Sequence, residues 1–333
     1  MKDFENILEK KFNHDFKRDE PLAKYTTLKI GGRAKYFVVV KSIEDLVWVA
    51  KTSREFKCQY FVLGGGSNVL IADKGYDGLV IKNEASNLVH QTNIVVCDSG
   101  LPISVMLKKL AESEMGGLEF LAGIPGTIGG AVNGNAGAWG KSMADIVLNI
   151  TVLTKNGKVK KFSKDEIGFR YRGSLIKDAI IENIKCPPVI LNIQLKTTKN
   201  TKEGILRIIS NYIKMRQQKQ PYGNSAGSTF KNIIDVENVP KDAKAFILDG
   251  VIPAGLVLDK LGYRGKKQGR IVVSEKHANF LINLGRGSSS DYALMVDEMQ
   301  SNAKKVLGLS LEKEIVYIGK IHEREKGFLK IFK

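Results

Sequence analysis

The chain has 333 residues, of which 43% are hydrophobic and 26% charged, and its formal net charge is +17. This length allows roughly two or three domains. No run approaches the roughly 18 apolar residues of a membrane helix, and the charged N-terminal segment lacks the apolar core of a secretory signal. These features exclude membrane insertion and secretion, and we expect a protein of the cytoplasm.

Cysteine usage and charge distribution narrow the possibilities further. Cys58, Cys97 and Cys186 are far apart and form no CxxC pair, which argues against a disulfide framework or a zinc site, and we expect no metal. Residues 151–220 contain 16 Lys and Arg against 5 Asp and Glu. Such a surface suits an anionic partner, either a nucleic acid or a phosphate-bearing small molecule. The sequence contains no recognisable nucleic-acid-reading motif.

The first part of the chain alternates strands and helices in a βαβ-like order. Short apolar, β-branched runs predict strands, and apolar residues at helical spacing predict helices. The first helix has Ser42 as N-cap, with Asp45 three residues on. The predicted strands are 36–40, 60–63, 79–82 and 94–97, and the predicted helices are 42–56 and 103–114.

The pattern changes near residue 146. An Asn156-Gly157 turn predicts a hairpin between strands 150–153 and 159–162. A turn-rich segment, 220–224, marks the start of a new unit. The later predictions are strands 189–195, 268–274, 280–284 and 311–319, and helices 202–216, 254–261 and 291–307, the last behind Ser288. This order predicts an α+β protein.

Two glycine-rich segments are candidate cofactor sites. Residues 64–68, Gly-Gly-Gly-Ser-Asn after a strand, offer backbone N–H groups in a tight curve, which suits a pyrophosphate. The segment fails as a dinucleotide fingerprint, because Val69 stands where GxGxxG needs its third glycine. An ordinary strand-to-loop turn is the alternative.

Residues 123–140 contain seven glycines and no charged side chain. Glycine at this density indicates positive φ or close approach of a large ligand, so we interpret the segment as a wall for a flat or extended cofactor. Gly140-Lys141-Ser142 resembles the end of a P-loop, but Asn135 replaces the glycine required five residues earlier. This mismatch disfavours ATP hydrolysis.

Several polar residues are candidates for chemistry, each with a structural alternative. Arg172 offers a fork for a carboxylate or is a surface residue at a strand end. Ser228 lies outside any G-x-S-x-G elbow and is a proton donor or a turn residue. Glu314 is an unusual buried carboxylate if it points inward, whereas Glu312 faces solvent. His277 has no second metal ligand nearby and caps a strand or orients a neighbour.

Seven segments, in order along the chain, resemble one family, the UDP-N-acetylenolpyruvoylglucosamine reductases (MurB). They are residues 25–32, 63–70, 117–130, 169–172, 226–228, 273–279 and 311–315. The short stretch between Arg172 and Ser228 resembles the subtype without an inserted substrate loop. Ile233 and Lys313 depart from the pattern, because the family has proline at both positions.

The resemblance implies a fold in three parts. A two-part FAD-binding module of the vanillyl-alcohol-oxidase (PCMH) type is joined to an α+β substrate-binding domain. We expect FAD-binding subdomain 1 over residues 1–85, subdomain 2 over 86–215 and the substrate-binding domain over 216–310. Residues 311–333 are expected to return to subdomain 2, and residues 320–333 form a basic extension without an assigned role.

The resemblance also implies an activity and its residues. NADPH reduces FAD, which then reduces UDP-N-acetylglucosamine enolpyruvate in peptidoglycan precursor synthesis. Arg172 stabilises the enolate, Ser228 donates the proton, and Glu314 is its relay or acid partner. The substrate is held by Tyr171, Lys219 and Asn232. The residues expected to bind FAD are Gly64, Gly65, Gly66, Ser67, Asn68, Ala122, Gly123, Pro125, Gly126, Gly129 and Gly130.

Two other functions compete with this interpretation. Another FAD-dependent oxidoreductase of the same fold would consume oxygen without NADPH, and the joint presence of Arg172, Ser228 and Glu314 argues against it. A nucleic-acid-binding protein would be colourless and bind with steep salt dependence. We therefore expect a monomer whose partners are NADPH and a UDP-sugar, with no nucleic acid.

Overall fold

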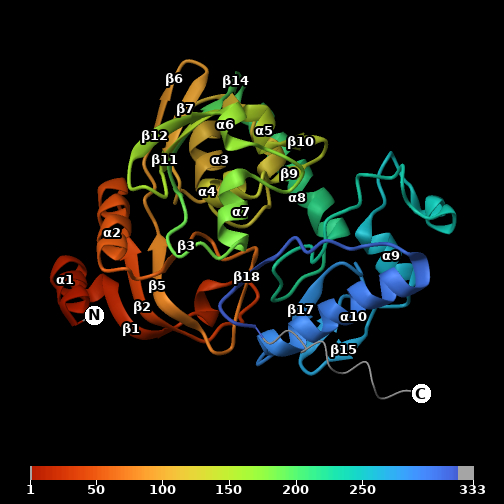
Figure 1. Cartoon of the computed structure of the whole chain (residues 1–333). Helices are drawn as coiled ribbons and strands as arrows, with labels where there is room; N and C mark the ends of the chain where they lie inside the picture. The colour runs from red at the N-terminus through yellow and green to blue at the C-terminus, as the bar shows by residue number, and fades with distance from the viewer. Residues whose placement is uncertain (1, 322–333) are drawn as a thin grey trace. The chain divides into compact units, whose positions relative to one another are not determined.

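The structure is a computed structural model that describes residues 2–321 (Figure 1). The chain divides into two compact units. Unit 1 comprises the chain up to Glu20 and residues 34–65 and 77–218, and unit 2 comprises residues 21–33 and 66–76 and the chain from Lys219 on. Each unit therefore combines segments that are far apart in the sequence. The domain boundaries expected at residues 85 and 215 stay a prediction.

The first sheet of unit 1 contains β1 (Phe16–Pro21), β2 (Arg33–Val40), β3 (Tyr60–Leu63) and β5 (Tyr76–Asn83). Its order is β1-β2-β5-β3, and β3 runs parallel to β5. The helices α1 (Lys2–Phe12) and α2 (Ile43–Glu55) contribute Phe4 and Leu46 to the core on this sheet. Ser42 caps α2 by accepting a hydrogen bond from the Asp45 N–H, which confirms the predicted helix start.

The second sheet of unit 1 is antiparallel, in the order β12-β11-β13-β7-β6. Its strands are β6 (Leu88–Gln91), β7 (Ile94–Asp98), β11 (Val147–Leu153), β12 (Val159–Ser163) and β13 (Val189–Lys196). Gly157 has a φ of +77° in the turn between β11 and β12, and the predicted hairpin is confirmed. β13 is apolar on both faces, because the adjacent residues Ile190 and Leu191 belong to the core of this sheet and to that of the first, respectively.

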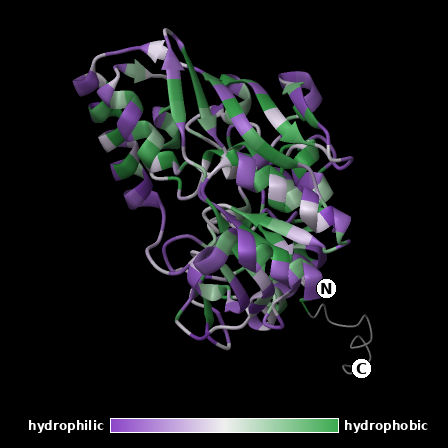
Figure 2. Cartoon of the chain, turned by 90° about the vertical axis from the view of Figure 1, so that its left-hand side faces the viewer, coloured by the Kyte–Doolittle hydropathy of each residue, from purple (hydrophilic) through white to green (hydrophobic). Residues whose placement is uncertain are grey.

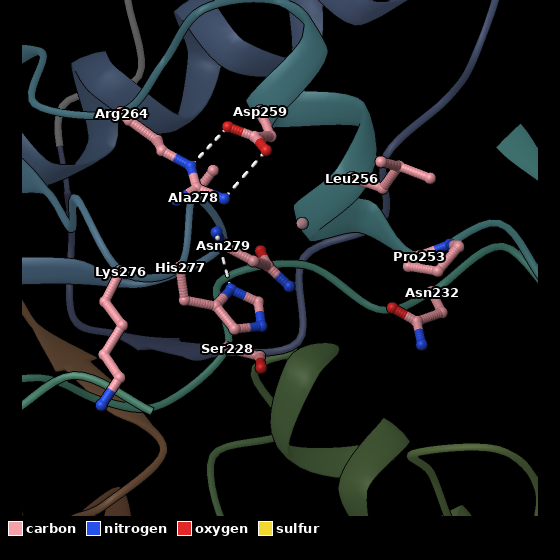
Figure 3. A pocket seen from close by; sticks show the side chains of 11 residues that line it. Ser228, Asn232, Pro253, Leu256, Asp259, Arg264, Lys276, His277, Ala278 and Asn279 are labelled. Atoms are coloured by element: carbon pink, nitrogen blue, oxygen red, sulfur yellow. Dashed lines mark hydrogen bonds and ion pairs between the residues drawn. The ribbon is translucent and has the colours of Figure 1, made fainter. Parts of the chain in front are cut away.

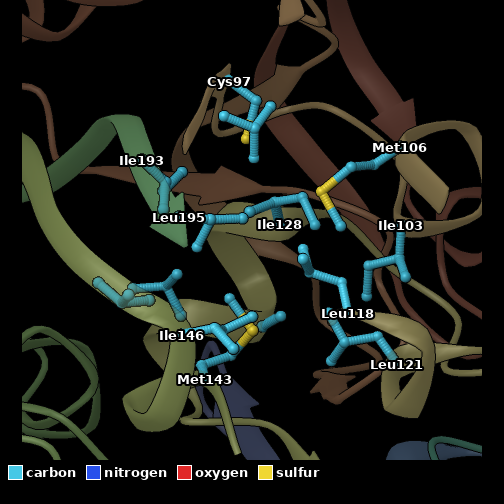
Figure 4. Packing of buried hydrophobic residues seen from close by; sticks show 14 of the residues in the cluster. Cys97, Ile103, Met106, Leu118, Leu121, Ile128, Met143, Ile146, Ile193 and Leu195 are labelled. Carbon is cyan, nitrogen blue, oxygen red and sulfur yellow. The ribbon is translucent and has the colours of Figure 1, made fainter. Parts of the chain in front are cut away.

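The remaining helices of unit 1 are α3 (Ile103–Glu112), α4 (Ile128–Asn133), α5 (Met143–Ile146), α6 (Lys164–Ile167), α7 (Leu175–Ile181) and the longer α8 (Lys202–Lys219), whose last residue belongs to unit 2. Figure 4 shows Met106 of α3, Ile128 of α4 and Met143 of α5 in one cluster with Ile193 and Leu195 of β13. Full burial of each such side chain contributes roughly 1.5–3 kcal/mol. This packing fixes α4, the helix within the glycine-rich segment 123–140.

Two-stranded ribbons join parts of unit 1. They pair β8 (Met115–Gly116) with β14 (Thr198–Lys199), and β9 (Gly137–Ala138) with β10 (Lys141–Ser142). The second ribbon turns at Trp139 and Gly140, both of which have positive φ. Lys141 and Ser142 form β10, and Ser142 is also the N-cap of α5, a helix of only four residues whose first turn contains Asp145.

Unit 2 consists of β4 (Val69–Ile71), β15 (Lys267–Gln268), β16 (Ile271–Val273), β17 (Leu281–Asn283), β18 (Val316–Ile318), α9 (Ala254–Lys260) and α10 (Ser289–Leu307). The strands β15, β16 and β17 form one antiparallel sheet, and α10 lies beside β15 (Figure 1). Ser288 caps α10 by accepting from the Asp291 N–H, as predicted. Figure 2 shows hydrophobic and hydrophilic residues alternating along both the strands and the helices.

Two predicted strands of unit 2 were wrong in extent. Residues 268–274 form two strands, because Gly269 takes a φ of +55° in the turn between β15 and β16. Of residues 311–319, only 316–318 form a strand, which pairs in parallel with β4. The described part of 311–333 belongs to unit 2, residues 322–333 lie outside the described structure, and the expected return to residues 86–215 stays a prediction. No helix among residues 2–321 is long and apolar enough to cross a bilayer.

Candidate active site

The two glycine-rich segments meet in unit 1. A Cβ on Gly64 would lie 2.5 Å from Thr127 Oγ1, and a Cβ on Gly65 would lie 2.5 Å from Gly126 Cα. Neither position can accept a side chain unless the backbone moves, because such separations lie far inside van der Waals contact. The structure thus brings Gly64 and Gly65 together with the predicted cofactor residues around Gly126.

Within the second segment, some glycines face the core and others face outward. Gly129 is buried, its N–H donates to Ser99 O at 2.8 Å, and a Cβ on it would lie 2.7 Å from Ser99. Gly123, Pro125 and Gly130 are exposed. The exposed members form an outer surface without side-chain charge, whereas Gly129 serves the packing of α4.

Lys82 contacts the first glycine-rich segment, residues 64–68, and was not identified from the sequence. Its Nζ donates to Gly64 O at 2.6 Å, and burial lowers the pKa of this ammonium group. The signal in the sequence is a single cation directly after the apolar run 79–81 of β5. Lys82 holds the loop backbone and adds positive charge next to it.

Arg172 projects from a tight turn over residues 170–173, closed by two backbone hydrogen bonds of 3.1 Å. Its φ is +54°, a region that costs a non-glycine residue about 1–3 kcal/mol. Lys177, only 2% exposed, donates from Nζ to Arg172 O at 3.0 Å. Arg172 Nη1 donates to Gly137 O at 3.0 Å, and its guanidinium lies 5.5 Å from the Tyr171 ring centroid. These contacts position the guanidinium beside the glycine-rich segment.

A second guanidinium, that of Arg216 in α8, lies near Arg172, and the sequence had not singled it out. Arg216 Nε donates to Ala122 O at 3.1 Å, and the guanidinium lies 5.9 Å from the centroid of Trp139, which stacks on Tyr212. Burial, and secondarily the charge of Arg172, lower the pKa of Arg216. Two neighbouring cations are stabilised by an anion between or beside them.

Unit 1 fits an extended, anionic cofactor such as FAD. Buried polar atoms are nearly always hydrogen-bonded in folded proteins, yet Arg216 Nη2 and Asn133 Oδ1 are buried and have no hydrogen-bond partner within residues 2–321. Both lie in or beside the glycine-rich segment, whose outer surface is free of side-chain charge. A ligand that brings acceptors, donors and negative charge would satisfy this surface.

In unit 2, Ser228 lies on a segment that other backbone groups hold firmly. Asn279 O accepts from the Thr229 N–H at 2.8 Å, and the Asn279 amide exchanges two hydrogen bonds with the backbone of Phe230. Glu314 N–H donates to Thr229 O at 2.9 Å, so the half-buried Glu314 lies on the segment next to that of Ser228.

Three other residues named in the sequence analysis, Asn68, Glu312 and Ile233, have defined contacts in unit 2. Asn68 Nδ2 donates to Glu314 O at 3.2 Å, which joins the end of the first glycine loop to this segment. Glu312 faces solvent as predicted, with a side chain 73% exposed that pairs with Lys231 at 2.6 Å. Ile233 exchanges two backbone hydrogen bonds with Ile252, and a proline at residue 233 could not donate one of them.

A cavity of about 380 Å³ opens in unit 2 (Figure 3). Its lining includes Ser228, Asn232, Asp259, Arg264, Lys276 and His277. Asn232 Oδ1 accepts from the Ala254 N–H at 3.2 Å, so Nδ2, a donor, is the amide group that remains for a ligand. Lys219 is not part of the lining. No group of three or more metal-ligating side chains occurs within the described residues.

The predicted residues thus divide between the units. Tyr171, Arg172, Gly64, Gly65 and the segment 122–130 belong to unit 1. Unit 2 contains Gly66, Ser67, Asn68, Lys219, Ser228, Asn232 and Glu314. Sequence reasoning missed Lys82 and Arg216, and His277 was noticed without a function.

Family models match both parts of the chain. A model described as an FAD binding domain matches residues 34–163, and a model of the UDP-N-acetylenolpyruvoylglucosamine reductase C-terminal domain matches residues 217–318. The first covers the glycine-rich segments of unit 1, and the second covers Ser228 and the cavity.

Whole-chain relatives carry the same description. A UDP-N-acetylenolpyruvoylglucosamine reductase of Lachnoclostridium phytofermentans is 35% identical over 308 residues, which are 90% of this chain and 92% of that protein. One of Clostridium novyi is 33% identical over 97% of both chains. The crystal structure of the corresponding Thermus caldophilus reductase matches with a TM-score of 0.68 at 29% identity, covering 90% of this chain and 97% of that one.

Proposed function

Because the chain belongs to the UDP-N-acetylenolpyruvoylglucosamine reductase family, we propose that Arg172, Ser228 and Glu314 carry out the chemistry of that family here. The chain is an FAD-dependent oxidoreductase that uses NADPH to reduce UDP-N-acetylglucosamine enolpyruvate to UDP-N-acetylmuramate, a step of peptidoglycan precursor synthesis. The single observation behind the residue assignment is the cavity of unit 2, which Ser228 and Asn232 line together.

FAD is held by the two glycine-rich segments in this proposal. The exposed surface of Gly123, Pro125 and Gly130 lies against the flavin, and the backbone N–H groups of residues 64–68 bind the pyrophosphate. Lys82, bonded to Gly64 O at 2.6 Å, adds positive charge there. When bound, FAD supplies hydride transfer from NADPH to the enolpyruvyl group.

Three side chains manage the charge and the proton of the second half-reaction. Hydride addition to the terminal enolpyruvyl carbon leaves negative charge on the adjacent carbon and its carboxylate. Arg172 stabilises that charge, and preorganised donors of this kind contribute several kcal/mol. Ser228 delivers the proton to the carbon, with Glu314, on the adjacent segment, as its relay or acid partner.

Substrate binding uses Tyr171, Lys219 and Asn232. Asn232 lines the cavity, and its Nδ2 donor is left for the substrate because its Oδ1 is already engaged by the Ala254 N–H. We further propose that the enzyme works as a monomer in the cytoplasm, where NADPH and UDP-sugars are available. Its three cysteines are free thiols, which is the expected state in a reducing compartment.

The visible spectrum followed by two half-reactions tests this function. The purified protein should be yellow, NADPH should bleach the flavin, and UDP-N-acetylglucosamine enolpyruvate should restore its colour without oxygen. A colourless protein that FAD cannot reconstitute would overturn the proposal. So would a reduced flavin that oxygen reoxidises rapidly and the sugar nucleotide does not, a result that favours an oxidase of the same fold.

A further inference from the structure

His277 lines the cavity of unit 2, and its ring is fixed in one orientation. The Asn279 N–H donates to its Nδ1 at 3.2 Å, and the ring centroid lies 4.9 Å from that of Phe280. A Cβ on Gly255 would lie 2.7 Å from Cε1, so a glycine at residue 255 leaves the room that the ring occupies. In Figure 3 the other ring nitrogen, Nε2, points into the cavity on the side of Ser228 and Asn232.

The bond from Asn279 determines which nitrogen bears the proton. A backbone N–H is always a donor, so Nδ1 is an acceptor and the proton of the neutral ring lies on Nε2. Nε2 has no hydrogen-bond partner among residues 2–321. The cavity therefore receives a neutral N–H donor with a fixed direction.

Burial, together with the charge of Arg264, favours the neutral form of the ring. Burial, and then the positive charge of Arg264, lower the pKa of His277, whereas the carboxylate of Asp259 acts in the opposite direction. Asp259 is engaged by Arg264, whose Nη2 donates to Asp259 Oδ2 at 2.9 Å. Lys276, exposed and next to His277, adds a further cation to the lining.

We propose that His277 is a substrate-binding residue that donates a hydrogen bond from Nε2 to a diphosphate oxygen of the nucleotide-sugar substrate. This rests on the proposed function. The neutral groups turned to the cavity, His277 Nε2 and Asn232 Nδ2, are donors, and Lys276 adds positive charge. An acceptor-rich anion such as a diphosphate complements these donors and this positive charge.

The second nitrogen gives His277 a separate, structural contact. Through Nδ1 it orients Asn279, which in turn holds the backbone of Thr229 and Phe230 beside Ser228. The two contacts use different ring atoms, and two variants separate them. In His277→Asn the amide oxygen takes the place of Nδ1 and the Nε2 donor is lost. In His277→Gln the amide nitrogen reaches the place of Nε2 and the Nδ1 acceptor is lost.

The test measures binding of UDP and of UDP-N-acetylglucosamine enolpyruvate to the oxidised, FAD-loaded enzyme by calorimetry. His277→Asn should raise both Kd values about tenfold, the size expected for one hydrogen bond to a charged group, with an unchanged flavin spectrum and melting temperature. His277→Gln should retain both affinities within about threefold.

Several outcomes would overturn the inference. Unchanged affinities in His277→Asn, a loss for the enolpyruvate without a loss for UDP, equal losses in both variants, or a wild-type enzyme that binds no UDP each contradict a donor to the diphosphate. Failure of the proposed function looks different: UDP binds and responds to His277→Asn, but the enolpyruvate does not reoxidise reduced flavin.

Discussion

The proposed catalytic residues are held in place by hydrogen bonds that involve the backbone, more than by contacts with one another. Arg172 tolerates a φ of +54° because the turn around it is closed by two hydrogen bonds and Lys177 is bonded to its carbonyl. Ser228 gains its fixed place from neighbours that bond to Asn279. The cost of an unfavourable φ is accepted at the residue whose side chain the proposed reaction requires.

Replacing Ser228 separates the two half-reactions. Because a serine hydroxyl that donates the proton acts only after hydride transfer from NADPH, Ser228→Ala should leave the rate of flavin reduction nearly unchanged. Reoxidation by UDP-N-acetylglucosamine enolpyruvate should slow about 10²–10⁴-fold, the usual contribution of a general acid. Anaerobic stopped-flow absorbance of the flavin measures both rates on one sample.

The control for this experiment is Ser225→Ala, since Ser225 lies on the same segment and its hydroxyl accepts from the Gly227 N–H. Both half-reactions should be close to wild type in the control. Equal slowing of both half-reactions in Ser228→Ala would mean that Ser228 is a structural residue.

The sequence indicated residues whose neighbours along the chain form a motif, and it missed those defined by tertiary contact. Residues 64–68 and 122–130 stand out by their glycine content. Arg216 is one cation in a basic helix, and only the fold reveals its contacts with Ala122 and Trp139 and its buried Nη2. The fixed tautomer of His277 likewise depends on a backbone N–H two residues away.

Helices and hairpins were predicted correctly where a capping or turn residue marks them in the sequence. The caps Ser42 and Ser288 and the turn at Gly157 are local devices, and each was found where the pattern indicated. The strand predicted over 268–274 failed because a turn at Gly269 divides an otherwise strand-like segment. The strand predicted over 311–319 shortened because its partner, β4, is only three residues long.

Two adjacent glycines of α4 give a matched test of the cofactor wall. Gly129→Ala should lower the free energy of unfolding by about 1–3 kcal/mol, because its Cβ meets Ser99 at 2.7 Å and overpacks the core. Gly130→Ala should leave stability equal or raise it by up to about 1 kcal/mol, because alanine favours helix and its nearest neighbour is 3.5 Å away. Urea unfolding of the FAD-free protein measures both changes.

FAD affinity should follow a different order from stability. The methyl group in Gly130→Ala stands on the exposed face where we place the flavin, so this variant should bind FAD more weakly although it is folded. Titration by quenching of flavin fluorescence provides the comparison. Wild-type FAD affinity in Gly130→Ala would remove Gly130 from the cofactor surface, and wild-type stability in Gly129→Ala would show that the contact with Ser99 relaxes easily.

At the scale of the whole molecule, the division into units follows long-range pairing that no local pattern reveals. The parallel pair β4–β18 joins residues 69–71 to residues 316–318, and it places the segment 66–76 in unit 2 although its sequence neighbours belong to unit 1. Composition nevertheless constrained the function correctly. The excess of positive charge is consistent with an enzyme whose cofactor and substrates are all polyanions.

Alkaline pH should destabilise the whole molecule through its buried acids. Burial raises the pKa of Cys58 to about 11, of Cys97 to about 12 and of Tyr60 to about 12, from ordinary values of 9.0, 9.0 and 10.0. At a pH between the ordinary pKa and the raised pKa of each group, the unfolded chain has lost a proton that the folded chain retains. The free energy of unfolding should therefore be nearly constant between pH 7 and 8 and fall from about pH 9 upward, by up to about 1.4 kcal/mol per pH unit for each such group.

Urea unfolding followed by circular dichroism at several values between pH 7 and 10.5 measures this slope, with Cys97→Ala as the matched variant. Its stability will be lower at every pH because a buried side chain has been shortened. The fall above pH 9 should nevertheless be shallower than in the wild type, because one group with a raised pKa has been removed. A parallel fall in the two proteins would mean that Cys97 ionises in the folded chain as it does in the unfolded one, and a rise in stability above pH 9 would contradict the sign of all three shifts.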